Sequence, residues 1–190
     1  PAVTAVSPTE GPTAGGNTVE ITGTNLGSAT KVKFGTTEVS PPYTENTATK
    51  IKVTAPAHAA GQVDVRVVTA GGESAVVAAD HYTFVAAPTC TTINPTSGSS
   101  AGGNTVELTG TNLLNATKVE FGTTVVNPPF TEDTATKIKV TAPAHAAGPV
   151  PVKVTTAGGT ATCSGGEYTY VASPAVTAVS PTEGPTAGGN

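Results

Sequence analysis

The chain has 190 residues and a net charge of -4, and only 12% of its residues are charged. It shows no cluster of Lys and Arg, which excludes the usual nucleic-acid binders because these need a basic face to neutralise phosphates. No apolar stretch approaches the roughly 18 residues that a membrane-spanning helix requires. Glycine and proline are abundant, with 22 and 16 residues, and this favours short strands joined by turns.

The first 87 residues predict a series of short strands. Apolar and polar residues alternate in Thr18–Thr22, in Lys31–Phe34 and most clearly in Gln62–Val67, where three valines share one face. Such alternation, with turn signals about every 8–12 residues, indicates an antiparallel β-sandwich, and no segment has a sustained helical period. The turns include Gly11-Pro12 and the recurring Gly-Gly pairs. The expected strands are 3–6, 18–22, 31–34, 50–53, 62–67, 74–77 and 82–84.

The chain then repeats itself. Residues 15–61 align without a gap on residues 102–148 with eight differences in 47 positions, and residues 1–17 return letter for letter as residues 174–190. A fixed period of this length is typical of an array of small domains. We therefore expect repeat 1 at residues 1–87, repeat 2 at 88–173, and the first strand and turn of a third, truncated repeat at 174–190. We also expect the chain to be a window of a longer array.

The order of motifs resembles a known domain family. Repeat 1 reads Pro-x-Val-x-x-Val-x-Pro, Gly-x-x-x-Gly-Gly-Asn-Thr-Val-x-Ile-Thr-Gly-x-x-Leu, Val-x-Phe-Gly, Ile-x-Val-x-Ala-Pro, Gly-x-Val-x-Val-x-Val and Tyr-Thr-Phe. This resembles the IPT/TIG domain of plexin-type receptors, Rel-type transcription factors, starch-acting enzymes and bacterial surface proteins. The resemblance implies an all-β chain of tandem immunoglobulin-like antiparallel β-sandwiches, arranged as beads on a rod. Among these branches, tandem Thr- and Ala-rich copies are most similar to the bacterial surface and secreted arrays.

Both cysteines lie in repeat 2, at Cys90 and Cys163, where a shift of 87 residues places Val3 and Val76 in repeat 1. A pair that changes together from Val/Val to Cys/Cys suggests two inward positions in contact. We expect a disulfide between the first strand of repeat 2 and the segment before its last strand, with two buried free thiols as the alternative. A disulfide in a small β-domain indicates an extracellular or cell-surface location.

Catalytic, cofactor and metal sites are not expected. His58 and His145 occupy the same place in the two repeats and are flanked by alanines, so we interpret them as loop residues. The acidic residues are spread singly, without the alternate carboxylates of a calcium loop. Two cysteines without a histidine at ligand spacing fall short of a zinc site. The aromatic residues recur one per strand and suit the core, except Tyr43 and Phe130, beside paired prolines, which could be exposed for ligand contact.

The functional hypothesis is a non-enzymatic stalk or filament on or from a bacterial cell. The short link through Pro88 leaves little room for hinge motion and predicts a stiff rod. The partners would be neighbouring repeats or other copies of the chain, and residues 174–190 could either start the next repeat or add a strand to a neighbouring chain. The alternatives are an adhesin whose repeats bind a host surface or polysaccharide, and the accessory domains of a secreted hydrolase.

Overall fold

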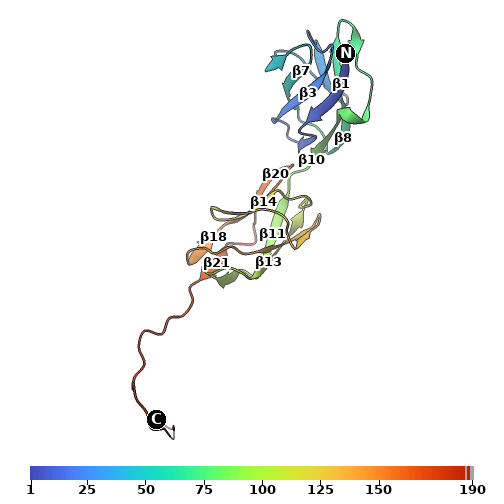
Figure 1. The fold of residues 1–190 in the computed structure, drawn as a ribbon. Coiled ribbons are helices and arrows are strands. Elements are labelled where there is room, and N and C mark those ends of the chain that lie inside the picture. Colours follow the sequence, from blue (N-terminus) through green and yellow to red (C-terminus); the bar gives the residue numbers. More distant parts are fainter. Residues whose placement is uncertain (187, 189–190) are drawn as a thin grey trace.

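The computed structural model describes residues 1–186 and 188 and places two β-sandwich domains one after the other along the chain (Figure 1). The fold is all-β, which confirms the prediction from the sequence, and each sandwich is formed by one repeat. No helix in the described part of the chain has the length and apolar character needed to cross a bilayer. The strands of repeat 1 are β1 (Ala2–Ser7), β2 (Glu10–Pro12), β3 (Thr18–Thr24), β4 (Lys31–Phe34), β5 (Thr37–Val39), β6 (Glu45–Asn46), β7 (Lys50–Thr54), β8 (Gly61–Thr69), β9 (Gly72–Glu73) and β10 (His81–Val85), with a 3-10 turn η1 (Ala78–Asp80).

Repeat 2 follows the same plan. Its strands are β11 (Thr89–Asn94), β12 (Ser97–Ser99), β13 (Thr105–Thr111), β14 (Lys118–Phe121), β15 (Thr124–Val126), β16 (Glu132–Asp133), β17 (Lys137–Thr141), β18 (Gly148–Val150), β19 (Val152–Thr156), β20 (Gly159–Thr162) and β21 (Tyr168–Val171). The single strand β8 of repeat 1 is divided into β18 and β19, where Pro151 stands in place of Asp64. Proline has no N–H to donate to a ladder, which explains the interruption.

Two sheets face each other in repeat 1. One has the order β1-β3-β7-β6, and the other has the order β2-β10-β8-β4-β5, with β9 added to β8. Strict alternation sends every second side chain inward, so Val19 and Ile21 of the first sheet meet Val65 and Phe34 of the second in one buried cluster. The antiparallel sandwich predicted from the sequence is therefore present.

The segment around Gly11 differs from the prediction, which had it as a turn. It forms the short strand β2, which pairs in parallel with β10, while β1 pairs antiparallel with β3 in the opposite sheet. The chain thus crosses from one sheet to the other between Ser7 and Glu10. Gly11 is needed there because a Cβ would lie 2.1 Å from the hydroxyl oxygen of Tyr82.

A cluster of three aromatic rings fills the centre of each sandwich. In repeat 1 the ring centroid of Tyr82 lies 5.5 Å from that of Phe34 and 5.0 Å from that of Phe84, both edge-to-face. Phe121, Tyr168 and Tyr170 repeat this arrangement in the second domain. Edge-to-face pairs at such separations add to the stabilisation from burying the rings.

The junction between the domains consists of residues 86–88. Pro88 is buried in repeat 2, and the Asn112 side-chain amide donates a hydrogen bond to the Ala87 carbonyl oxygen at 2.9 Å. Gly158 approaches the link so closely that a Cβ there would lie 2.1 Å from the carbonyl oxygen of Ala86. The link is therefore in contact with the second domain along its length.

Residues 172–186 form no strand and lie exposed beyond repeat 2 (Figure 1). Residues 175–180 match β1 in sequence, and β1 is held by pairing with β3. By the same spacing, the counterpart of β3 would begin after residue 190. Its assignment to a third repeat stays a prediction, and residues 187, 189 and 190 lie outside the described residues.

Candidate functional site

The two aromatic residues expected to be exposed are partly buried. Tyr43 and Phe130 both pack against the core of their own repeat. The Tyr43 hydroxyl donates a hydrogen bond to the Val39 carbonyl oxygen at 3.0 Å, and partial burial raises the pKa of Tyr43. A ligand contact at these two positions stays a prediction.

The loop histidines have a packing role. The His58 ring stacks on Phe84 with centroids 4.8 Å apart, and His145 stacks on Tyr170 at 5.0 Å. In each ring Nδ1 lies 2.9 Å from the carbonyl oxygen of the next residue, Ala59 or Ala146. These rings cover the aromatic cluster at one end of each sandwich, where we interpret them as structural.

Cys90 and Cys163 form a disulfide that closes one flank of repeat 2. Cys90 lies in β11 of one sheet, and Cys163 follows β20 of the other, so the bond joins the two sheets. Both residues are buried, and the Cys163 N–H donates to the Val152 carbonyl oxygen at 2.8 Å. Strand β20 therefore extends along β19 up to the cysteine.

Repeat 1 closes the same flank differently. Val3 is buried like its counterpart Cys90, but Val76 is 54% exposed, so the expected inward contact between Val3 and Val76 is wrong. The expected strand 74–77 is absent as well. The buried Ser74 explains both the exposed Val76 and the missing strand. Its Oγ accepts a hydrogen bond from the Val67 N–H at 3.1 Å, so this N–H is not free to pair with a backbone carbonyl and continue the ladder. The chain then leaves β8 and turns through η1 before it enters β10.

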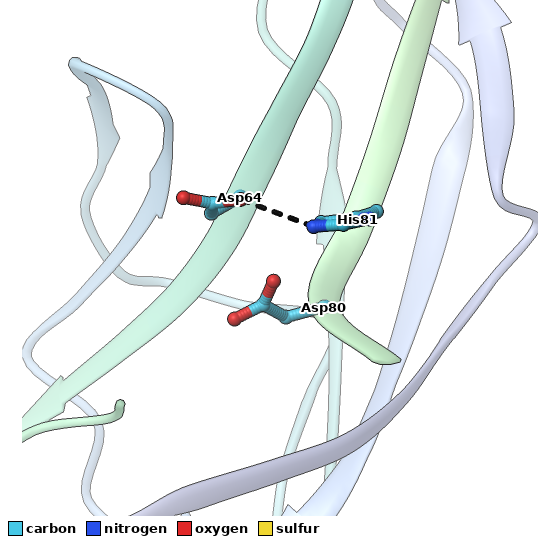
Figure 2. Close-up of side chains that lie close together, drawn as sticks. All are labelled: Asp64, Asp80 and His81. Carbon is cyan, nitrogen blue, oxygen red and sulfur yellow. Dashed lines mark ion pairs between the residues drawn. The ribbon is translucent and has the colours of Figure 1, made fainter. Parts of the chain in front are cut away.

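This detour brings three potential metal ligands together. Asp64 lies on β8, and its register partner across the ladder is His81, the first residue of β10. The His81 Nε2 is 3.6 Å from the Asp64 Oδ1, and one donor atom from each of Asp64, Asp80 and His81 lies within 4.8 Å of the other two. Figure 2 shows the Asp80 carboxylate extending into the space beside the Asp64–His81 pair.

Asp80 is the unusual member of this group, because its side chain is fully buried. Its Oδ2 accepts a hydrogen bond from the Val77 N–H at 3.0 Å, across the 3-10 turn. Its Oδ1 has no hydrogen-bond partner, and no ion pair links Asp80 to a basic side chain within residues 1–186 and 188. A buried carboxylate oxygen without a partner is costly, so this one calls for an explanation.

The sequence pattern did not predict this group. Asp64 is separated from Asp80 and His81 by a full strand and a loop, and each acid stands alone in its segment. One sequence feature could have indicated the group. Asp80 and His81 are adjacent at the start of β10, and β10 pairs antiparallel with β8, which carries Asp64. Repeat 2 has Pro151, Gly166 and Glu167 at the three equivalent positions, so the group belongs to repeat 1.

The outer face of the first sheet carries a row of ion pairs that is the same in both repeats. In repeat 1, Lys50 contacts Glu20 at 2.9 Å and Lys52 contacts Glu45 at 3.2 Å. In repeat 2, Lys137 contacts Glu107 at 3.2 Å and Lys139 contacts Glu132 at 2.8 Å. Exposed pairs of this kind stabilise little, and they keep this face of the sheet charged and in contact with water.

Comparison with known proteins identifies the repeated unit. The sequence profile described as IPT/TIG domain matches residues 1–84 and again residues 88–170. No curated protein gives a significant sequence match to the chain.

Among solved structures, the chain is similar to the extracellular region of plexin A4. In one structure, of domains 1 to 10, the TM-score is 0.56 at 23% identity, over 95% of this chain and 16% of the plexin chain. In another, of domains 1 to 8, the TM-score is 0.52 at 24% identity, over 90% and 18%. SGBP-B from a xyloglucan utilization locus of Bacteroides uniformis aligns at a TM-score of 0.41 and 23% identity, over 89% and 49%. The chain thus spans less than a fifth of the plexin chains, and at these identities the likeness concerns the fold.

Proposed function

We propose, from the premise that this chain belongs to the IPT/TIG domain family, that it is a non-enzymatic structural repeat region forming a stiff extracellular stalk or filament on or from a bacterial cell. The observation that carries this proposal is the junction between the repeats. Pro88 is buried in repeat 2, Asn112 holds the Ala87 carbonyl, and Gly158 leaves only enough space for the backbone of Ala86. A link held in this way supports a fixed angle between domains, in contrast to a long flexible tether.

Both halves of this junction recur at the ends of the chain. Asn25 and Gly71, the counterparts of Asn112 and Gly158, are exposed on repeat 1. Residues 171–174, the counterparts of residues 85–88, are exposed after repeat 2. Further repeats of the same kind could therefore dock at either end through the contacts already made between repeats 1 and 2, which supports an array built head to tail.

An extracellular location fits the disulfide, which persists in oxidising compartments. Surface adhesion or polysaccharide binding is the alternative function. It would need an aromatic or polar contact surface, and partial burial of Tyr43 and Phe130 leaves less ring area for it. An accessory role in a secreted hydrolase would depend on a catalytic domain elsewhere in the protein.

Small-angle X-ray scattering of the chain tests the stiff junction. The wild type should scatter as one elongated particle, and Gly158→Val should lose that shape because the new side chain collides with the Ala86 backbone. Gly71→Val is the matched control, since its Cβ would meet only the Thr69 Oγ1, at 3.6 Å. If the wild type scatters as two independently moving domains, the rod is wrong. If both variants scatter alike, the close approach of Gly158 to Ala86 does not hold the junction.

Negative-stain electron microscopy of the native protein tests the assembly. Continuous filaments with an axial repeat of one or two domains would support the stalk or filament. Short isolated rods that end in a distinct globular domain would contradict it and favour the binding alternative.

A further inference from the structure

We infer that Asp64, Asp80 and His81 form a binding site for one divalent transition-metal ion, of which Zn²⁺ is the probe. Three donor atoms, from two strands and a turn, lie within 4.8 Å of one another. Two of the donors are already fixed by the register of the sheet, in which His81 lies opposite Asp64. The third reaches them only because η1 folds back before β10 begins.

The Asp80 Oδ1 gives a separate indication of a bound cation. This oxygen is buried and without a hydrogen-bond partner, although its carboxylate extends toward the other two side chains (Figure 2). Burying a carboxylate is unfavourable unless it is paired or coordinates a metal. A cation beside Asp80 supplies the missing partner and balances the two carboxylates of the group.

The donor set indicates the kind of ion. Two carboxylate oxygens and one imidazole nitrogen suit zinc and its neighbours, whereas calcium requires six to eight oxygens. Around a tetrahedral zinc ion with bonds of about 2.1 Å, the donors are about 3.4 Å apart. The Asp64–His81 separation of 3.6 Å is near this value. Asp64 and His81 are both partly exposed, so small rotations of their side chains can bring the remaining distances into range.

The site also has solvent access and a structural effect. The His81 and Asp64 side chains are both partly exposed, so an ion and its water can reach the group from solvent. A bound ion would tie η1 to β8 and β10. It would thus fasten the flank of repeat 1 that corresponds to the flank closed by the disulfide in repeat 2.

The test is an NMR titration of the complete chain with Zn²⁺, following the imidazole nitrogens. The chain has three histidines, so His58 and His145 serve as internal controls. We expect His81 alone to shift, with saturation at one equivalent of metal. Asp64→Asn and Asp80→Asn should each weaken binding, measured by isothermal titration calorimetry, by roughly tenfold or more.

Asp133→Asn is the matched control, because the equivalent residue of repeat 1 is Asn46, and it should bind as the wild type does. Should Asp80→Asn fail to fold, judged by its amide spectrum, the partly exposed Asp64→Asn decides the matter. The inference is overturned if His81 does not respond to excess Zn²⁺, if all three histidines shift together, or if the folded variants retain wild-type affinity.

Discussion

Repeats 1 and 2 share an aromatic cluster, the strand order of the first sheet and an outer row of ion pairs, yet they differ along one flank. In repeat 2, β20 runs on to Cys163 and a disulfide joins the sheets. In repeat 1, Ser74 ends the pairing early, and the 3-10 turn places the buried Asp80 there. The core thus tolerates very different closures of its edge. The alternation of the strands defines the sandwich, whereas a few residues between β9 and β10, or between β20 and β21, decide how the flank is held.

Truncation of a central ring in each repeat tests whether the two cores are equivalent. Phe34→Ala and Phe121→Ala should each lower the free energy of unfolding of their own repeat by roughly 3–5 kcal/mol, because each removes a fully buried ring and leaves a cavity. Urea unfolding, monitored by hydrogen exchange of peptides from each repeat, would measure the stability of the two repeats separately. Markedly unequal losses would show that the two cores are not equivalent.

Removal of the disulfide tests the difference between the flanks. The cysteines are 73 residues apart, and on the loop-entropy account opening such a loop lowers the free energy of unfolding by about 4 kcal/mol. Cys90→Val with Cys163→Val should therefore destabilise repeat 2 and leave the exchange protection of repeat 1 unchanged. Loss of protection in both repeats would show that the flanks are coupled through the junction.

A third test uses alkaline pH and the one position of the three-ring cluster that differs between the repeats, Phe84 against Tyr170. Burial raises the pKa of Tyr170 from 10.0 to about 12. Between these values the unfolded chain binds fewer protons than the folded one, so stability is complete below pH 10 and falls as the pH rises toward 12. We expect repeat 2 to lose about 2–3 kcal/mol over this window, measured by urea unfolding at each pH.

Tyr170→Phe is the control for this test, since it introduces the residue type of repeat 1. The Tyr170 hydroxyl is buried without a partner, so its removal should abolish the steep loss and raise stability at neutral pH by about 1 kcal/mol. An unchanged alkaline profile in the variant would assign the loss to another group. Burial also raises the pKa of Tyr82, so a smaller loss is expected in repeat 1.

The smallest effect concerns the shared ion pairs. A hydrogen bond from Lys50 lowers the pKa of Glu20, and one from Lys139 lowers the pKa of Glu132. Carboxylates with lowered pKa values stabilise the fold above their unfolded value of 4.5, and this contribution is lost as the pH falls through the folded value. Both repeats should weaken slightly and in parallel below pH 4.5, and less so at high salt, since exposed pairs are screened. A loss confined to one repeat would contradict the equivalence of the outer faces.

The sequence was sufficient to predict the elements whose side chains alternate. Strands β4 and β7 lie where alternation placed them, and the disulfide follows from the paired change at two positions. The sequence was insufficient where a side chain replaces a backbone partner. The Ser74 hydroxyl does so, and the strand expected at residues 74–77 is absent for this reason. It also concealed β2, which has three residues and no alternation, and whose hydrogen bonds depend on a strand some 70 residues away. The Asp64–Asp80–His81 group was missed because only the register of β8 and β10 brings its members together.

The parallel pairing of β2 with β10 has a mechanical consequence. Because β2, near the start of repeat 1, and β10, its last strand, run the same way, tension applied along the chain pulls β2 and β10 in opposite directions along their common ladder. The registered pairs, from Glu10–Thr83 to Pro12–Val85, are then loaded in shear and resist together, whereas peeling would open them one at a time. In repeat 2, β12 pairs with β21 in the same parallel arrangement. Each domain therefore has its own pair of strands that resists stretching of the chain by shear.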